Sequence, residues 1–567
     1  MKKYLLLPFI LLSITVKAQL SGTNTIPGDY ATITAAITAL NANGVGAGGV
    51  TFNIAAGYTE TGNTTITATG TAANPIIFQK NGAGANPTIT AGVGTGWDAI
   101  FKMVGTDYIT FDGLTLQENP ANSSGNYIQK TENGFGFFKV DATNGCQYNT
   151  IKNCTISLDR LFYQISPGNI AYYSTAVYMN NENAGNAWIN SESTATGTHS
   201  YNIIQNNTIS DVGQGVFIYG YHNTSSSIAV IERHNEVKDN TITYGGNSVA
   251  RGIGLFYAAN CTVSGNTIST HTAHQAGAVA IDYNPTGKSG CLITNNTIQL
   301  DGNSVTGAQK AIQITGGGGP MAADPLWKSI TITNNTILPS NTNYDYTGIY
   351  CLYGGAEFEI IENNIINLSS NPSTNSGEAH GIDVGNWWAD ATIITIKNNL
   401  IQGHASSLTN FFGIYTSDNT DLVTIENNKV INNSSSIYQG INITGSNGSV
   451  AKNNLIASGT SNTHYTYIGL QISSDGTSAI NNYIGNRASY SASAVAFGLQ
   501  VGANGNTNPI KVYHNTVYID GNPSSVNVTS AYSINSTQNV DTRNNIFTMQ
   551  CYLAHLVIIK FLLLQMV

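Results

Sequence analysis

Side chains that can bind a sugar recur at one position in a series of short apolar segments. In "GIYC" (348–351), "GIDV" (381–384) and "GIYT" (413–416), one aromatic or acidic residue follows a glycine–isoleucine pair. Successive side chains of a strand point to opposite faces, so an isoleucine that faces the core leaves the next residue facing outward. The outward residues along the chain are Tyr178, Phe217, Gly254, Asp282, Gln313, Tyr350, Asp383, Tyr415, Asn442, Gln471 and Gln500. Aromatic rings lie against sugar rings, and amides and carboxylates bond to hydroxyl groups, so the series indicates a polysaccharide-contacting face.

Tryptophans support this interpretation by their position. Four of the five, Trp188, Trp327, Trp387 and Trp388, fall in the loops just after these segments. The candidate carbohydrate-binding residues are Tyr350, Asp383, Tyr415, Trp387, Trp388, Trp327 and Asp282. Stacked coils would space successive members of the series about 4.8 Å apart along the axis. The alternative is that outward tyrosines are ordinary strand residues that pack only on neighbouring coils.

Catalysis is less well supported, and no catalytic residue is assigned. Glycoside hydrolysis needs two carboxyl groups roughly 5 to 9.5 Å apart. Asp282 and Asp383 would lie three coils, or about 14 Å, apart. A loop acid such as Asp324, Asp345 or Glu378 could supply a partner. No cysteine–histidine cluster has metal-ligand spacing, so no metal or cofactor is expected, although scattered acids could take Ca²⁺ adventitiously.

The elements that position these residues are marked by a second motif, a pair of asparagines between short β-type runs, as in "SITITNNTIL" (329–338) and "EIIENNIINL" (359–368). The second residue of each motif is Cys154, Asn207, Asn240, Asn266, Asn296, Asn335, Asn364, Asn399, Asn428, Asn454, Asn482, Asn515 and Asn545, at intervals of 26 to 39 residues after a first interval of 53. Such periods indicate a solenoid. Asparagine tolerates the left-handed conformation at a sharp corner, and stacked amides can bond to one another along the axis. The pattern predicts an all-β parallel β-helix with three short strands per coil and an internal asparagine ladder.

The two motifs together resemble the pattern "GI-x-[ILV] … I-x-x-N-x-I" of the right-handed parallel β-helix repeat family, the pectin-lyase-like superfamily, over roughly residues 45–548. The resemblance implies a fold that hosts lyases, hydrolases, esterases, epimerases and adhesins, so it does not select one activity. The paired-Asp, "HG" and "R-I-K" set of polygalacturonases and the Arg-x-Pro-x-x-Arg of pectate lyases are missing. An adhesin-like or polysaccharide-binding protein is therefore expected, with a polysaccharide lyase or glycoside hydrolase as the alternative.

The two ends of the chain differ from the repeats. Residues 1–18, which open with "MKKYLLLPFILLSITVKA", have the form of a secretory signal peptide, and this opening resembles exported surface proteins of Bacteroidetes-type bacteria. The β-helix is expected over 19–548. An amphipathic helix at about 29–42, with Asp29 as its N-cap, is expected to close the open end of the coil. The apolar tail 549–567 is either an end cap or the aberrant product of a lost reading frame; its length and Lys560 disfavour a membrane span.

Charge and cysteine content limit the possible partners. Loss of Lys2, Lys3 and Lys17 with the signal peptide would change the formal net charge from -9 to -12. An acidic chain with five arginines lacks the basic surface that nucleic acid requires. A secreted or cell-surface monomer that contacts a glycan, with no membrane span in the mature chain, is expected. Cys261 and Cys291 each lie five residues before an asparagine of the motif, so they would stack either as a disulfide or as free core thiols.

Overall fold

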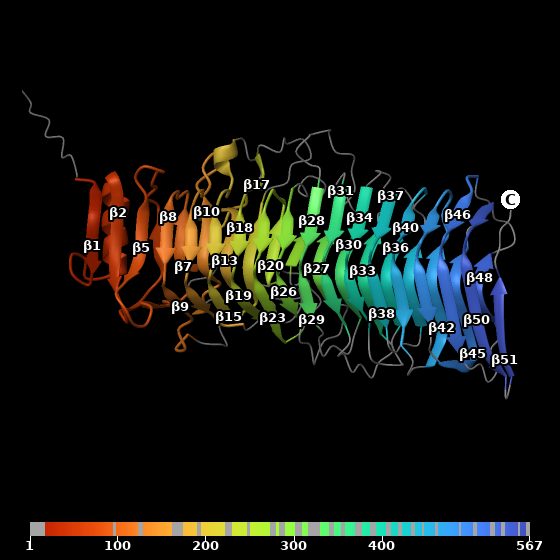
Figure 1. Ribbon diagram of the computed structural model, residues 1–567. Coiled ribbons are helices and arrows are strands. Elements are labelled where there is room, and N and C mark those ends of the chain that lie inside the picture. Colours follow the sequence, from red (N-terminus) through yellow and green to blue (C-terminus); the bar gives the residue numbers. More distant parts are fainter. Residues whose placement is uncertain are drawn as a thin grey trace, which may run out of the picture.

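The computed structural model describes residues 18–562 except 95–97, 123–128, 161–173, 190–193, 221–229, 246–249, 273–278, 283–289, 301–308, 316–328, 339–344, 353–357, 369–376, 386–392, 404–409, 418–421, 433–436, 445–446, 460–462, 487–488, 503–506, 522–527, 535–538 and 554–555. The expected signal peptide lies almost wholly outside these residues. The protein is an elongated parallel β-solenoid whose strands stack from β1 at one end to β51 at the other (Figure 1). The predicted all-β parallel architecture is confirmed.

Sheet A contains the strands that precede the asparagine turns, and its strands pair in parallel with the next member along the chain. They are β1 (Leu20–Ile26), β2 (Val45–Ala55), β5 (Ile76–Asn81), β8 (Ile109–Asp112), β11 (Thr150–Lys152), β14 (Ile203–Gln205), β18 (Glu236–Lys238), β22 (Thr262–Ser264), β25 (Leu292–Thr294), β28 (Ser329–Thr333), β31 (Phe358–Glu362), β34 (Ile393–Lys397), β37 (Leu422–Glu426), β40 (Val450–Lys452), β43 (Ser478–Ile480), β46 (Ile510–Tyr513) and β49 (Val540–Arg543).

Sheet B contains the strands that follow those turns. They are β3 (Thr59–Thr61), β6 (Thr88–Thr90), β9 (Thr115–Gln117), β12 (Thr155–Ser157), β15 (Thr208–Val212), β19 (Thr241–Gly245), β23 (Thr267–Thr272), β26 (Thr297–Gln299), β29 (Thr336–Leu338), β32 (Ile365–Asn367), β35 (Leu400–Gln402), β38 (Lys429–Asn432), β41 (Leu455–Ser458), β44 (Tyr483–Asn486), β47 (Thr516–Gly521), β50 (Ile546–Leu553) and β51 (Leu556–Leu562). β50, which runs into the predicted tail, continues the parallel stack beside β47, and β51 folds back antiparallel on β50.

Sheet C contains the strands with the glycine–isoleucine motif. They are β4 (Thr64–Ile66), β7 (Ala99–Val104), β10 (Asn133–Lys139), β13 (Thr175–Asn183), β16 (Gln214–Tyr219), β20 (Ile253–Phe256), β24 (Val279–Asp282), β27 (Gln309–Thr315), β30 (Tyr346–Leu352), β33 (Glu378–Gly385), β36 (Asn410–Ser417), β39 (Ile437–Ile443), β42 (Thr463–Ile472), β45 (Ser489–Val501) and β48 (Val528–Ile534). Outside the three sheets, β17 (Glu232–Arg233) pairs with β21 (Ala258–Ala259), and a 3₁₀ helix, η2, spans Ala195–Gly197.

The two asparagines of each turn have different roles. Asn398, the first, adopts the left-handed conformation with a φ of 57° and is exposed. Asn399, the second, is 1% exposed; its Oδ1 accepts the N–H and the Nδ2–H of Asn364, and its Nδ2 donates to the Asn428 Oδ1 and the Ile361 carbonyl. The same contacts repeat from Asn207 to Asn545. The predicted internal ladder is confirmed, and the buried second asparagine of each pair forms it.

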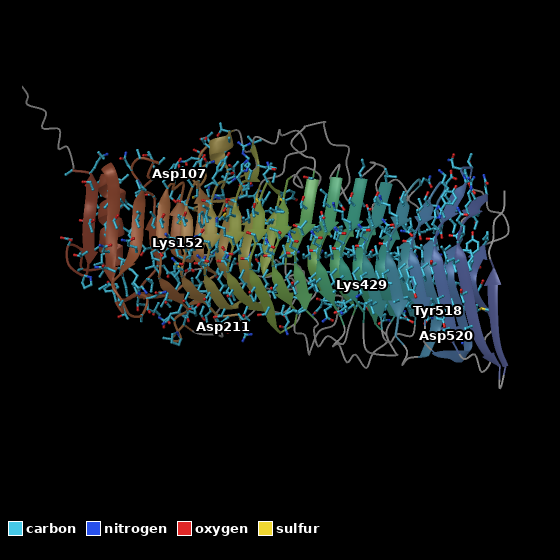
Figure 2. All side chains as sticks on the ribbon, viewed as in Figure 1. Asp107, Lys152, Asp211, Lys429, Tyr518 and Asp520 are labelled. Carbon is cyan, nitrogen blue, oxygen red and sulfur yellow. The ribbon has the colours of Figure 1, made fainter. Side chains whose placement is uncertain are left out.

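Alternation gives the solenoid an apolar interior and a polar exterior. In β31, β34 and β37, the residues Ile361, Ile396 and Ile425 are buried in successive coils of one core. Polar side chains project outward along the whole length (Figure 2). On sheet A the Lys152 ammonium lies 3.1 Å from the Asp112 carboxylate of the adjacent coil. Exposed pairs of this kind contribute little to stability, so the core and the ladder hold the fold.

A single α-helix lies near the start of the described chain. α1 spans Ile33–Asn43, and its residues Ile33, Ala36, Ile37 and Leu40 are buried, so the helix is amphipathic. Asp29 is not its cap: the Thr32 hydroxyl accepts the Ala35 N–H, while the Asp29 carboxylate accepts the N–H of Thr25. The Glu60 carboxylate accepts the N–H groups of Ile33 and Thr34, two of the unsatisfied donors that begin every helix. The helix therefore begins later than predicted because a hydroxyl next to the first turn replaces the more distant carboxylate.

Candidate functional site

A row of glycines in sheet C separates two rows of outward side chains. In β33 the residues Glu378, His380 and Asp383 are exposed or half-buried, and Gly381 and Ile382 between them are buried. A Cβ on Gly381 would lie 2.5 Å from both the Gly413 carbonyl oxygen and the Ile401 Cγ2, so no larger residue fits. Because Gly381 and Ile382 are both buried, the alternation of buried and outward side chains is interrupted at this point of the strand. Side chains on both sides of the glycine therefore face outward.

The register of sheet C brings the predicted residues Tyr350, Asp383 and Tyr415 together. Tyr350 pairs with Asp383, and Asp383 pairs with Tyr415, on the successive strands β30, β33 and β36. All three side chains are half-buried. The sequence-based spacing of one coil between neighbours is thus correct for these residues.

Asp282 does not belong to this row. β24 pairs Ala280 with Gln313, the row member of the next coil, whereas Asp282 pairs with Phe256. The prediction placed Asp282 next to Gln313 in the outward series, and the true register differs from that alignment by two residues. The side chain of Asp282, and Trp327, Trp387 and Trp388, lie outside the described residues. So does Asp324.

The second outward row places His380 beside Asp383. The row contains Lys310, Thr347, His380 and Phe412 in register. The His380 Nδ1 lies 3.5 Å from the Asp383 Oδ2, and its Nε2 lies 3.4 Å from the Glu378 Oε2. The Nε2–Glu378 contact is a long hydrogen bond, whereas the Nδ1–Asp383 contact does not meet hydrogen-bond geometry. Glu378, expected in a loop, is the first residue of β33, and its N–H donates to the Asp345 Oδ1 of the preceding coil at 2.8 Å.

Aromatic rings flank the histidine. The Phe412 ring stacks on His380 with centroids 4.6 Å apart, and Tyr415 meets the same ring edge-on at 5.8 Å. Two coils before His380 in the row, the Lys310 ammonium lies 3.6 Å from the centroid of the Tyr350 ring, which belongs to the coil between them. These residues, Tyr350, Glu378, His380, Asp383, Phe412 and Tyr415, are called the sheet C patch below.

The two carboxyl groups of the sheet C patch differ in the direction in which their pKa is shifted. Burial raises the pKa of Asp383, while His380 and Lys310 oppose that rise. The hydrogen bond from His380 is the main cause that lowers the pKa of Glu378. One imidazole between two carboxyl groups of different acidity is a chemical arrangement that can bind hydroxyl groups or act in general acid–base catalysis.

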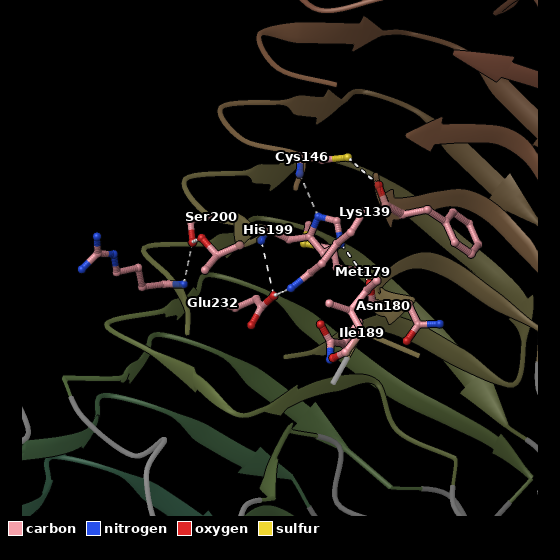
Figure 3. A network of polar contacts seen from close by, with 12 residues as sticks. Lys139, Cys146, Met179, Asn180, Ile189, His199, Ser200 and Glu232 are labelled. Carbon is pink, nitrogen blue, oxygen red and sulfur yellow. Dashed lines mark hydrogen bonds and ion pairs between the residues drawn. The ribbon is translucent and has the colours of Figure 1, made fainter. Parts of the chain in front are cut away.

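A second polar cluster is entirely internal (Figure 3). The Lys139 ammonium at the end of β10 lies 2.9 Å from the Glu232 Oε1, and both side chains are fully buried. The His199 Nδ1 accepts the N–H of Cys146 at 3.0 Å, and its Nε2 contacts the Asn180 carbonyl oxygen at 2.9 Å. Burial, and then the charge of Lys139, lower the pKa of His199 to about 3, so its ring is neutral. A polymer does not reach fully buried groups, and we assign this cluster a structural role.

The sequence motifs did not point to either histidine. His380 stands immediately before the glycine–isoleucine motif. Strict alternation, counted from the outward Asp383, predicts that this side chain points inward. Lys139, His199 and Glu232 stand outside both motifs. The one available signal was composition: in a chain with 9% charged residues, an acid and a histidine beside the motif, as in "GEAH" (377–380), are unusual.

Two broader features complete the description of the site. Among the described residues, no three His, Cys, Asp or Glu side chains are grouped to hold a metal ion. Within the same part of the chain, no helix is long and apolar enough to cross a membrane. Cys261 and Cys291 are buried, free thiols that contact each other across one coil.

Fold and site together define a parallel β-solenoid with an acidic and aromatic patch on one outer sheet. Neither a protein-family model nor a curated relative matches the sequence. In fold the chain resembles solved right-handed β-helix proteins. A tailspike protein of E. coli bacteriophage HK620 in complex with a pentasaccharide has 10% identity and a TM-score of 0.43, with 92% of this chain and 76% of that chain covered.

Two further solved structures are similar at the same level. A GH136 lacto-N-biosidase from Eubacterium ramulus has 11% identity and a TM-score of 0.38, with 74% of this chain and 63% of that chain covered. An alginate lyase from Paenibacillus sp. has 14% identity and a TM-score of 0.34, with 60% of this chain and 94% of that chain covered. At these TM-scores the likenesses carry no argument about activity, which is argued below from the residues alone.

Proposed function

We propose that the protein binds a polysaccharide on the outer face of sheet C, as an exported, adhesin-like surface or secreted protein. The observation that supports this is the register of Tyr350, Asp383 and Tyr415, reinforced by His380 and Phe412 across the glycine row. Half-buried rings next to a carboxylate match the needs of a sugar, which presents apolar ring faces and hydroxyl edges. No cofactor is required for such binding.

Export, the form of the coil and the oligomeric state belong to the same proposal. The N-terminal sequence supports export through a signal peptide ending at Ala18. Strands β30, β31 and β32 follow one another before β33 returns beside β30, which supports a coil of three strands. The buried face of α1 supports a role in closing the first coil, since an open end would expose unpaired strand edges. The protein is proposed to act as a monomer.

The experiment that tests binding is a screen of the mature protein against neutral, amino-sugar and uronic polysaccharides by affinity electrophoresis. Retarded migration in at least one polysaccharide gel, with none for an unrelated acidic protein, is the expected result. Unchanged migration in every gel contradicts the proposal.

A second candidate function is cleavage by a polysaccharide lyase or glycoside hydrolase activity. The specific observation in its favour is that His380 lies between Glu378 and Asp383. Glu378 thereby supplies the second carboxyl group that the row of Tyr350, Asp383 and Tyr415 lacks. Incubation of the bound polysaccharide with the protein distinguishes the two functions. New reducing ends or unsaturated ends that disappear in His380→Ala indicate an enzyme, and an intact polymer indicates a binding protein.

A further inference from the structure

The charges around the sheet C patch are unbalanced. Three carboxylates lie close together: Glu378 and Asp383 are on β33, and Asp345 is the residue just before the adjacent strand β30. The N–H of Glu378 on the Asp345 Oδ1 places these two acids on neighbouring coils at the same end of their strands. Lys310 and His380 are the cationic groups that act on Asp383. Even with His380 protonated, acids outnumber bases among these described residues.

The bases are also engaged within the patch. The Lys310 ammonium lies over the Tyr350 ring, and the two nitrogens of His380 face Glu378 and Asp383. A ligand carboxylate would have to displace these contacts and would approach the remaining acids as a like charge, which disfavours binding. The whole chain adds to this repulsion, because its formal net charge is -9.

The uncharged parts of the patch suit a neutral sugar. Half-buried Tyr350, Tyr415 and Phe412 offer apolar ring surface, and the carboxylates of Glu378 and Asp383 accept hydrogen bonds from hydroxyl groups. Hydrogen bonds from a neutral donor to an ionised acceptor are stronger than those between neutral groups. The acids that repel a uronate therefore favour a hydroxylated, uncharged ligand.

We infer that the sheet C patch selects an uncharged glycan and discriminates against polyuronates, with Asp345, Glu378 and Asp383 as the specificity-determining residues. This inference rests on the proposed function and gives its substrate class. Asp345 contributes charge and accepts the N–H of Glu378, a hydrogen bond that an asparagine oxygen can also accept, so Asp345→Asn separates charge selection from binding.

A matched pair of ligands tests the inference. The probes are a neutral polysaccharide that binds in the screen and the same polymer with its primary hydroxyl groups oxidised to carboxylates. The oxidised form is expected to bind about tenfold more weakly at low salt. High salt should reduce this ratio of the two affinities, because screening shortens the range of the repulsion. Asp345→Asn and Glu378→Gln are expected to reduce the ratio as well, whereas Lys429→Gln, an exposed charge on sheet B, should leave it unchanged.

The outcomes of this test are distinct from those of the function itself. Equal or tighter binding of the oxidised polymer, or a screen that finds only uronic polysaccharides, overturns the inference and leaves the proposed function standing. A ratio that the Asp345→Asn and Glu378→Gln variants do not change also overturns it. Absence of any polysaccharide binding overturns the proposed function, and the inference with it.

Discussion

The His380 Nδ1 lies 3.5 Å from the Asp383 Oδ2, although the two residues are three positions apart in one strand and regular alternation would place them on opposite faces. The reason is the buried pair Gly381–Ile382, which turns the chain so that residues on both sides of it face outward. The same glycine is enclosed by the next coil. The packing around Gly381 inside the solenoid therefore places His380 and Asp383 side by side on its surface.

This dependence predicts the effect of a single methyl group. Gly381→Ala places a Cβ 2.5 Å from the Gly413 carbonyl oxygen, so the strand must move, and we expect a loss of about 1–3 kcal/mol of unfolding free energy. Gly92→Ala is the control, because its Cβ would meet its nearest atoms at 3.4 to 3.7 Å. Urea denaturation measures both, and equal midpoints for the two variants would show that the glycine row is not required by packing.

The asparagine ladder predicts different effects for neighbouring residues. Asn399→Leu leaves the N–H and Nδ2–H of Asn364 without their acceptor, and we expect it to lower the unfolding free energy by about 1–3 kcal/mol. Asn398→Gly removes an exposed side chain from a left-handed position that glycine adopts readily, so its midpoint should stay close to that of the parent. A midpoint for Asn399→Leu equal to the parent value would mean that the amide is an ordinary turn residue.

The buried ion pair predicts strong coupling between two residues far apart in sequence. Lys139→Met leaves the fully buried Glu232 carboxylate without its cation, and we expect a loss of about 3–5 kcal/mol. The double variant Lys139→Met/Glu232→Leu removes both charges and should recover much of that loss. A double-mutant cycle by chemical denaturation measures the coupling. Additive losses in the double variant would contradict a direct interaction.

The neutral ring of His199 predicts a loss of stability in acid. Its pKa is about 3 in the folded protein, against an ordinary value near 6.5 in the unfolded chain. Between these values the unfolded chain binds a proton that the folded protein does not, so stability is complete above about pH 6.5 and falls as the pH falls toward 3. Thermal melts from pH 8 to pH 4 should show a shallower decline for His199→Asn than for the parent, with the difference at pH 8 as the reference. Parallel declines would show that the ring does not titrate on unfolding.

The repeats made the fold and the row of Tyr350, Asp383 and Tyr415 predictable, because both depend on short-range patterns. The asparagine pair and the glycine–isoleucine motif recur once per coil, so Asn399 and Tyr350 could be placed without long-range information. Asp282 was misplaced because coil lengths vary, and similar letters in unequal coils do not fix the register. His380 was missed because the bend at Gly381 departs from strict alternation. The Lys139–Glu232 pair was missed because the two residues lie 93 positions apart in the sequence and meet only when the coils stack.

The most direct test of the central claim, that the sheet C patch binds polysaccharide, is the affinity of a Tyr350→Ala/Tyr415→Ala variant for a glycan that binds the parent. Isothermal titration calorimetry compares it with Tyr483→Ala, which removes an exposed tyrosine from β44 on sheet B. We predict an affinity at least about tenfold lower for the double variant, since each lost ring contact costs about 1 kcal/mol, and parent affinity for Tyr483→Ala. Circular dichroism should remain β-rich in both. Parent affinity in the correctly folded double variant would contradict the account, because the row would then be ordinary strand surface.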